Sequence, residues 1–424
     1  MKIIRPTKKN LDRILRRGVV DTSQVEKTVR TIIEDVRLRG DNALLEHTAR
    51  FDGVRLRASE LKVNNQGIKK ALKTIPRRDL GIIKLAARRI KDFHRRQLPG
   101  SWYFVEKDGT RLGQKVTPLE RVGIYVPGGK AVYPSTVLMN AIPPRVAGVK
   151  EVIMVTPPSK DGINPYVLAS AHIAGVDRIY QVGGAQAIAA LAYGTETIPK
   201  VDKIVGPGNI YVATAKRLVF GVVDIDMVAG PSEILIINDG TGDPAWIAAD
   251  LLSQAEHDEL SSSILLTTSK EIAKAVAKEV SSQLNNLKRK AIARRSIDRY
   301  GVIIIIKDLI EAVNIANEIA PEHMELFLKR PFTLLKRIKN AGAIFLGPNT
   351  PEALGDYIAG PNHTLPTGGT ARFSSPLGVE DFLKRSSILA FSRRGLERLG
   401  HNVVRFADIE GLEAHGRSVA VRLG

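Results

Sequence analysis

The middle of the chain alternates between short apolar runs and stretches with helical periodicity. The apolar runs are rich in valine and isoleucine and occupy residues 122–126, 152–155, 179–182, 203–205, 225–228, 234–237, 264–267 and 302–306. The stretches between most of them repeat apolar residues every three or four positions, as one face of a helix does. This alternation is typical of α/β proteins that are built on parallel sheets. The first hundred residues instead predict helices, at 28–37 and at 66–97 with a break at Pro76.

Glycine or proline follows every apolar run between residues 121 and 232. Gly183-Gly184 and Gly206-Pro-Gly208 are two of five such turns. In open α/β sheets, ligands bind beyond the carboxyl ends of the strands, where these turns would lie together. A single short loop often contains glycine without binding anything, but five in succession favour a nucleotide. The Gly-x-Gly-x-x-Gly pattern is absent, because Tyr211 stands where its third glycine would be.

A polar stripe interrupts an otherwise apolar helix that we predict after the run at 234–237. Asp243 stands where an N-cap is expected, and Pro244 where the first helical residue is expected. Asp250, Gln254 and His257 then fall on one face, at positions i, i+4 and i+7. Three such residues by themselves most often form a solvated helix face. Gln-x-x-His is not a strong zinc-site spacing, and histidine is more often structural than a metal ligand, so these residues alone do not predict a metal site.

The last third of the chain places polar residues in turns and loops. We predict a helix at 309–319 that Pro321 ends, with Glu322 and His323 directly after it. An imidazole beside a carboxylate is what general-base catalysis requires, although a surface turn can carry the same pair. Residues 341–380 are rich in glycine and proline, and loops of this length are usually functional. A charged amphipathic helix is expected at 270–295, and a small helix in the tail at 383–424.

Composition excludes several classes of function. The 424 residues include no cysteine, so disulfides, cysteine zinc sites and thiol nucleophiles are ruled out. No apolar run approaches membrane-spanning length and the first residues lack the apolar core of a signal peptide, so we expect a cytoplasmic protein. The net charge of +19 comes mainly from residues 1–100, which hold 26 Lys and Arg but 11 Asp and Glu. Such basic faces attract nucleic acid only non-specifically, because the 5% aromatic content offers no stacking platform.

Two nearly adjacent segments carry a resemblance to a known family. Asp-Ile-Asp-Met-Val-Ala-Gly-Pro-Ser-Glu at 224–233, followed by Ala-Asp-Leu-Leu-Ser-Gln-Ala-Glu-His at 249–257, resembles the signature of the histidinol dehydrogenases. The resemblance implies an α/β fold of incomplete dinucleotide-binding-like parallel-sheet domains, with a helical N-terminal segment and a small C-terminal tail domain. The implied boundaries are an N-terminal arm at 1–25, a discontinuous α/β domain at 26–119 and 233–375, an NAD-binding α/β domain at 120–232, and a tail domain at 376–424.

The resemblance also implies roles for the scattered polar residues. The implied zinc ligands are Gln254, His257, Asp356 and His415, the catalytic residues are Glu322 and His323, and the NAD contacts are Tyr125, Gln186 and Asn209. Ser232, His363 and Glu410 would contact the substrate, together with the zinc ligands and His323. The discontinuous domain would carry the zinc and catalytic residues. The tail domain would dock on the partner subunit of a homodimer and supply His415 and Glu410 there.

The implied reaction is the four-electron oxidation of L-histidinol to L-histidine by two NAD⁺, through bound histidinal, at the end of histidine biosynthesis. His323 would remove the alcohol proton, and Glu322 would activate the water that hydrates the aldehyde. One zinc ion per subunit would orient the substrate's imidazole and amino nitrogens. Two alternatives stay open. One is a zinc- and NAD-dependent alcohol dehydrogenase of the same fold that acts on another small alcohol, and the other is a basic binding protein without enzymatic activity.

Overall fold

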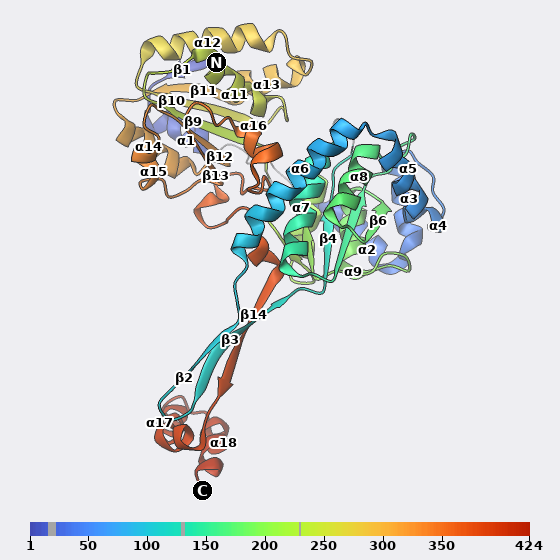
Figure 1. Ribbon diagram of the computed structural model, residues 1–424, viewed down its shortest axis with the longest axis vertical. Coiled ribbons are helices and arrows are strands. Elements are labelled where there is room, and N and C mark those ends of the chain that lie inside the picture. Colours follow the sequence, from blue (N-terminus) through green and yellow to red (C-terminus); the bar gives the residue numbers. More distant parts are fainter. Residues whose placement is uncertain (16–22, 129–131, 229) are drawn as a thin grey trace.

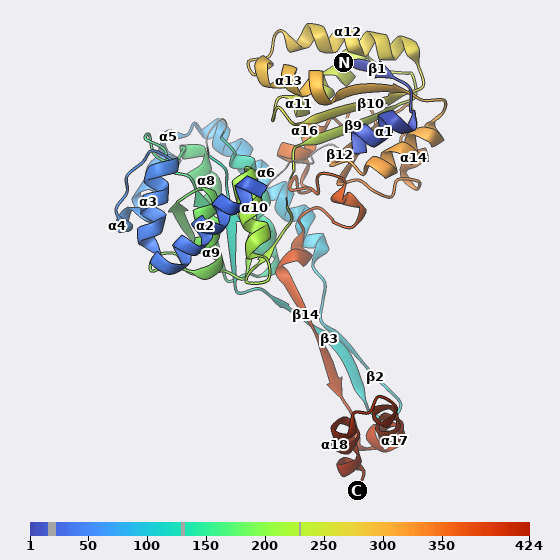
Figure 2. The same ribbon diagram turned by 180° about the vertical axis from the view of Figure 1, so that it is seen from behind.

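The computed structural model describes residues 1–15, 23–128, 132–228 and 230–424. Two α/β lobes lie side by side, and a long arm leaves the second lobe and ends in two C-terminal helices (Figure 1). The view from behind shows that the N-terminus lies on the first lobe and the C-terminus at the far end of the arm (Figure 2). Among these described residues, no helix combines the length and the apolar character needed to cross a bilayer.

The first lobe is built on a parallel sheet of six strands in the order β1-β11-β10-β9-β12-β13. The strands are β1 (Lys2–Ile4), β9 (Glu233–Asn238), β10 (Ser262–Thr267), β11 (Gly301–Ile305), β12 (His323–Phe327) and β13 (Ala343–Leu346). Successive side chains of β9 alternate between the two faces, so Ile234 and Ile236 join one core while Leu235 and Ile237 join the other. Helices cover both faces, which explains why the central strands are continuous apolar runs.

The helices of the first lobe divide between these two cores. One face carries α11 (Pro244–Ala255), α12 (Lys270–Leu284) and α13 (Lys290–Tyr300), and the other carries α1 (Lys8–Leu15), α14 (Leu309–Ile319) and α15 (Phe332–Leu335). The predicted N-cap is confirmed, since Asp243 accepts a hydrogen bond from the Ala245 amide (2.8 Å). The single helix expected at 270–295 is wrong. The chain turns at 285–289, and this turn lets Val280 and Ile297 pack in the same core.

The second lobe is built on a parallel sheet of five strands in the order β6-β5-β4-β7-β8. The strands are β4 (Arg121–Tyr125), β5 (Glu151–Thr156), β6 (Arg178–Gln181), β7 (Lys203–Val205) and β8 (Asp224–Ile225). Helices α7 (Pro134–Ala147) and α8 (Pro165–Ala174) cover one face, and α9 (Gly184–Tyr193) and α10 (Ile210–Val219) cover the other. Four of the five apolar runs between 121 and 228 therefore form strands, whereas the run at 225–228 overlaps the two-residue β8 only at Ile225.

The helices between residues 23 and 97 pack on the second lobe. They are α2 (Ser23–Arg39), α3 (Asp41–Phe51), α4 (Ala58–Leu61), α5 (Asn65–Thr74), α6 (Arg77–His94) and the 3-10 turn η1 (Arg95–Gln97). Val29 of α2 shares a core with α9, and Ile90 of α6 shares one with α7. This packing differs from the expected grouping of 26–119 with 233–375. Helical periodicity shows that a face is buried but not which sheet buries it.

The arm is an antiparallel sheet in the order β14-β3-β2. Its strands are β2 (Trp102–Val105), β3 (Arg111–Pro118) and β14 (Leu383–Ala390), so it joins segments that are far apart in the sequence. The helices α17 (Arg393–Ile409) and α18 (Glu413–Leu423) form its tip (Figure 1). Between β13 and β14 the chain forms four short elements: α16 (Glu352–Leu354), the π-turn η2 (Gly355–Ala359), η3 (Thr370–Arg372) and η4 (Val379–Phe382).

Candidate functional site

Glu322 and His323 are buried where the chain passes from α14 into β12. Ala320 adopts a left-handed conformation (φ 50°) and Pro321 follows it, so the helix ends sharply. Glu322 accepts a hydrogen bond from the Glu233 amide (2.8 Å), and Nδ1 of His323 donates to the Glu233 carbonyl (3.0 Å). The first residue of β9 therefore orients both side chains. It also leaves Nε2 of His323 as the nitrogen that can take a proton.

Three carboxylates surround the imidazole of His323. Its Nε2 lies 3.7 Å from Oδ1 of Asp356 and 3.9 Å from Oε1 of Glu352, while its Nδ1 lies 3.5 Å from Oε2 of Glu322. Burial opposes a positive charge on the ring, but these carboxylates outweigh it and raise the pKa of His323 well above its usual range. The site therefore favours a cation, whether a proton or a metal ion.

Glu352 and Asp356 reach this imidazole from one short helical segment. They are four residues apart, in α16 and η2, and π-turns such as η2 occur frequently at functional sites. Burial raises the pKa of Glu352 to about 8, and the charge of Asp356 adds to this shift. Burial also disfavours a charge on Asp356, but His323 and His363 outweigh it and lower its pKa. His323, Glu352 and Asp356 each offer one nitrogen or oxygen atom, and these three atoms lie within 4.8 Å of one another, as metal ligands do.

Gln254 and His257 have different environments, although both were predicted on one helix face. Helix α11 ends at Ala255, so His257 lies in the turn beyond it and is exposed. Gln254 is 1% exposed, and neither polar atom of its carboxamide has a hydrogen-bonding partner. Gln254 is therefore not part of a solvated face, whereas His257 is in contact with solvent. A buried amide without well-formed hydrogen bonds is costly, so Gln254 is a candidate ligand-binding residue, and Glu352 lies beside it.

Ser232 lies close to Glu322 and His323 through Glu233, its neighbour in the chain, and His363 lies close to them in space. Ser232 directly precedes Glu233, whose backbone holds Glu322 and His323. Nδ1 of His363 donates to the Asp356 carbonyl (3.0 Å), and burial lowers the pKa of its imidazole. His363 is therefore mostly neutral at pH 7 and offers its second nitrogen as an acceptor.

Glu410 and His415 are not brought to this cluster within one chain. Glu410 follows the last residue of α17, and His415 lies in the first turn of α18. Both are exposed at the tip of the arm, which is remote from the first lobe in both views (Figures 1 and 2).

Tyr125, Gln186 and Asn209 lie at the carboxyl edge of the five-stranded sheet. Tyr125 ends β4, its hydroxyl accepts a hydrogen bond from the Gly184 amide (3.1 Å), and burial raises its pKa to about 12. Gln186 lies in the first turn of α9, and its Nε2 is buried without a partner. Asn209 caps α10 by accepting two amide hydrogen bonds of 3.1 Å. These positions agree with the expectation that a ligand binds at this edge of the sheet.

A buried ion pair supports the turn that leads to Asn209. Gly206 has φ 111°, and a side chain there would meet the Tyr125 carbonyl at 2.2 Å, so only glycine fits. Lys216 of α10 donates to the Gly206 carbonyl (2.9 Å) and pairs with Asp226, which accepts from the Gly206 amide (2.8 Å). The side chains of Lys216 and Asp226 are 2% and 1% exposed. The ion pair of Lys216 and Asp226 therefore stabilises the turn by hydrogen bonds to the Gly206 backbone.

The family follows from the chain as a whole. The family model described as histidinol dehydrogenase matches residues 15–423. The chain belongs to the histidinol dehydrogenase family. It is 61% identical to histidinol dehydrogenase from Syntrophotalea carbinolica over 413 residues, which cover 97% of this chain and 96% of that protein. It is 55% identical to histidinol dehydrogenase from Aquifex aeolicus over 412 residues, with 97% and 96% covered.

A solved structure agrees with this assignment. The crystal structure of histidinol dehydrogenase from Elizabethkingia anophelis matches with a TM-score of 0.95 and 38% identity, covering 100% of this chain and 98% of that chain. The predicted family, the α/β fold class and the enzyme class are confirmed, so this histidinol dehydrogenase family member is an oxidoreductase.

Two buried acids near the site were not predicted from the sequence. Glu325 accepts a hydrogen bond from the Glu352 amide (2.8 Å). Burial, followed by the neighbouring charge of Asp250, raises the pKa of Glu325 well above its usual range. Regular spacing could have identified both. Glu352 precedes Asp356 by one helical repeat, and Glu325 follows His323 by one strand repeat.

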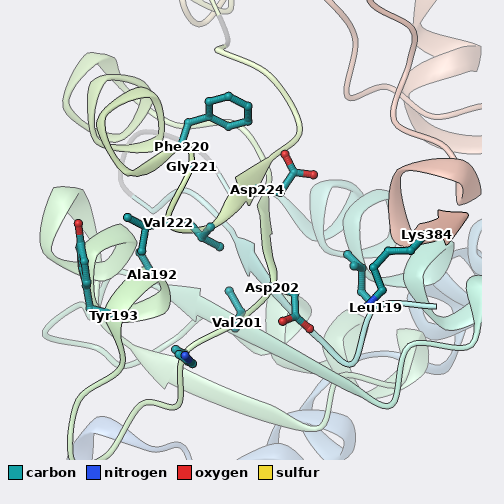
Figure 3. Close-up of a pocket in the computed structure, with 12 residues that line it drawn as sticks. Leu119, Ala192, Tyr193, Val201, Asp202, Phe220, Gly221, Val222, Asp224 and Lys384 are labelled. Atoms are coloured by element: carbon teal, nitrogen blue, oxygen red, sulfur yellow. The ribbon is translucent and has the colours of Figure 1, made fainter. Parts of the chain in front are cut away.

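A cavity of about 510 Å³ lies away from this cluster, at the amino edge of the five-stranded sheet (Figure 3). Leu119, Asp202 and Val222 line it from the segments that lead into β4, β7 and β8, and Ala192 lines it from the end of α9. None of the predicted site residues lines it. It lies on the opposite edge of the sheet from Tyr125, so it is not part of the candidate site.

Proposed function

We propose that this protein catalyses the four-electron oxidation of L-histidinol to L-histidine through bound histidinal, with two NAD⁺ and one zinc ion per subunit. It would complete histidine biosynthesis in the cytoplasm. The observation that carries the proposal is the buried cluster of His323, Glu322 and Asp356, with the unpartnered carboxamide of Gln254 on the neighbouring helix. The full-length similarity to histidinol dehydrogenases supports the choice of substrate.

The donor set fits zinc. Asp356 offers a carboxylate that is 15% exposed, Gln254 offers an amide oxygen without a partner, and the imidazole of His257 lies one turn beyond Gln254. The carboxylates around His323 add the negative charge that a divalent cation requires. Zinc bound by these residues would orient the substrate's imidazole and amino nitrogens and polarise its reacting oxygen.

The catalytic roles follow from the hydrogen bonds of the pair. Nδ1 of His323 is committed to the Glu233 carbonyl, so Nε2 would take the alcohol proton of histidinol once a bound cation offsets the carboxylates that raise the pKa of the ring. The carboxylate of Glu322, held by the Glu233 amide, orients the water that adds to the aldehyde before the second hydride transfer. Tyr125, Gln186 and Asn209 would hold NAD⁺, which would supply a hydride acceptor for each step. In single-turnover measurements, Glu322→Gln should slow histidinal oxidation more than histidinol oxidation, and equal losses would contradict this division of roles.

The arm supports an active site that is shared between two chains. Glu410 and His415 are exposed at its tip, beside Phe406 and Ile409, which are 63% and 66% exposed. Two short helices cannot bury a core of their own, so the tip requires a surface on which to dock. In a symmetric homodimer, each tip would dock on the partner's first lobe and complete its site.

The reaction is tested by NAD⁺ reduction with histidinol and with a panel of simple alcohols. We expect strong preference for histidinol and loss of activity after chelation, with recovery when zinc is added. His257→Ala should lose zinc while it retains its fold, because His257 is exposed and outside α11. Equal rates with simple alcohols would favour another dehydrogenase of the same fold. Full zinc occupancy in His257→Ala would contradict its role as a ligand.

The shared site is tested by refolding two inactive variants together. His323→Ala removes a residue of the first lobe, and His415→Ala removes one of the tip. In a heterodimer with shared sites, one site carries both lesions and the other carries neither, so activity returns in part. If native mass spectrometry finds heterodimers and the mixture remains inactive, each site is built within one chain.

A further inference from the structure

Asp356 lies on a segment whose N-terminal side is anchored to the first lobe. Glu352, one helical repeat before it, donates its amide to Glu325 of β12 (2.8 Å). Gly355 packs so closely on β13 that a side chain at this position would lie 2.6 Å from the ring of Phe345. These contacts fix where η2 begins. They do not fix how the turn ends.

The C-terminal side of the same segment is anchored to the second lobe by Arg89 of α6. The guanidinium donates from Nε to the Ile358 carbonyl (2.6 Å) and from Nη2 to the Ala359 carbonyl (3.2 Å). The side chain of Ile358 packs on the core between α6 and α7. Gly360 has φ 115°, and a side chain there would lie 2.8 Å from the Arg89 carbonyl. Both the side chain and the backbone of Arg89 therefore contact the end of η2.

This arrangement matches what the end of a helical turn requires. The last carbonyls of such a turn have no partner within it and carry partial negative charge. The planar guanidinium satisfies two successive carbonyls at once, and a charged donor makes the stronger kind of hydrogen bond. The turn η2 is a single π-turn, which is rare except where its surroundings hold it. The segment that carries Asp356 is therefore held by contacts with the first lobe at its start and with the second lobe at its end.

We infer that Arg89 is a positioning residue for Asp356, through which the second lobe sets the geometry of the metal site. The inference rests on the proposed function, because it takes Asp356 as a zinc ligand. It goes further by assigning a role to a residue that contacts neither metal nor substrate. It also explains one arginine among the many basic residues of the first hundred, whose charge the proposed reaction does not use.

Arg89→Ala should loosen the end of η2 and weaken zinc binding by roughly 10-fold, as loss of a residue that supports a metal ligand commonly does. Arg89→Lys keeps the charge but offers a single ammonium in place of a fork, so it should recover only part of this loss. The matched control is Arg88→Ala, which removes the same charge from the exposed neighbouring position on α6. The control should bind zinc as the parent does.

The measurements are zinc affinity by competition with a chromogenic chelator, the visible spectrum of the Co²⁺-substituted protein, and NAD⁺ affinity. Arg89→Ala should weaken zinc binding and change the cobalt spectrum, while its NAD⁺ affinity stays within about twofold of the parent. Zinc affinity equal to that of Arg88→Ala, or equal losses of zinc and NAD⁺ affinity, would overturn the inference. A parent protein that binds no zinc refutes the metal assignment as well, so the two failures are distinguishable.

Discussion

Removal of the Asp226 carboxylate should destabilise the second lobe by about 3–5 kcal/mol. In Asp226→Ala, the Lys216 ammonium stays buried and retains the Gly206 carbonyl as an acceptor but loses its counter-charge. The amides of Gly206 and Met227, which donate to Asp226 at 2.8 and 2.6 Å, lose their acceptor as well. Each buried unsatisfied amide costs about 1–3 kcal/mol, so the uncompensated charge is the largest single contribution.

A neighbouring ion pair provides the matched control. Lys203 and Asp224 are the same two residue types in the same lobe, 3.0 Å apart, but the side chain of Asp224 is 52% exposed. Asp381 lies 3.7 Å from the Lys203 ammonium and remains after Asp224 is removed. The Lys203 side chain is only 7% exposed, but it keeps Asp381 as a counter-charge and the lost carboxylate is half-exposed, so Asp224→Ala should cost less than about 1 kcal/mol.

Thermal unfolding by calorimetry measures the difference. For a lobe of this size, Asp226→Ala should lower the melting temperature by about 6–20 °C and Asp224→Ala by no more than about 4 °C. Adding Lys216→Met to Asp226→Ala removes the stranded charge and should recover part of the loss. The reasoning is refuted if the two aspartate variants melt at the same temperature, or if the double variant loses the full sum of the single losses.

Three further predictions concern other buried groups. Burial raises the pKa of Asp52 from near 4 in the unfolded chain to about 6 in the folded protein. The folded state therefore loses stability relative to the unfolded chain as the pH rises from 4 to 6. In denaturation measured at several pH values, Asp52→Asn should be about 1 kcal/mol more stable than the parent at pH 7 and equally stable at pH 4. Gly360→Ala should cost about 1–3 kcal/mol, because its φ of 115° and the Arg89 carbonyl leave no room for a side chain; an unchanged melting temperature would contradict this. Glu352→Gln removes a carboxylate 3.9 Å from His323 and should weaken zinc binding about 10-fold, whereas parent-like affinity would leave Glu352 without a part in the site.

Local patterns predicted eight strands of the two parallel sheets, one of them (β8) at a single residue, and several helices, but none of the arm strands β2, β3 and β14. The strand at 203–205 and the helix at 309–319 match the structure residue for residue, and the break at Pro76 separates α5 from α6. These features depend on residues close together in the chain: on the apolar periodicity, on the N–H that proline lacks, and on N-cap residues such as Asp243. The failure at 270–295 is of the same kind, because charged helical periodicity continues through the turn that separates α12 from α13.

Chemical residue types predicted part of the site. The residue pattern alone left Glu322 and His323 as either a surface turn or a catalytic pair for proton transfer, and the family resemblance implied their catalytic roles. The structure buries both. Glu352 was overlooked, although it precedes Asp356 by one helical repeat. The burial that makes it unusual is a tertiary property, and in sequence it is one glutamate among many solvated ones.

The sequence by itself determined the fold class, the family and the residue types of the chemistry, because each is written in local periodicity or in a nearly contiguous signature. Only the tertiary structure decided which groups meet. It placed the helices of residues 23–97 on the five-stranded sheet, separated the buried Gln254 from the exposed His257, and suspended Asp356 between two lobes. It also placed His415 at the tip of a long arm. These arrangements depend on contacts between residues far apart in the chain, and a hydrophobic pattern with a period of two or four residues does not predict such contacts.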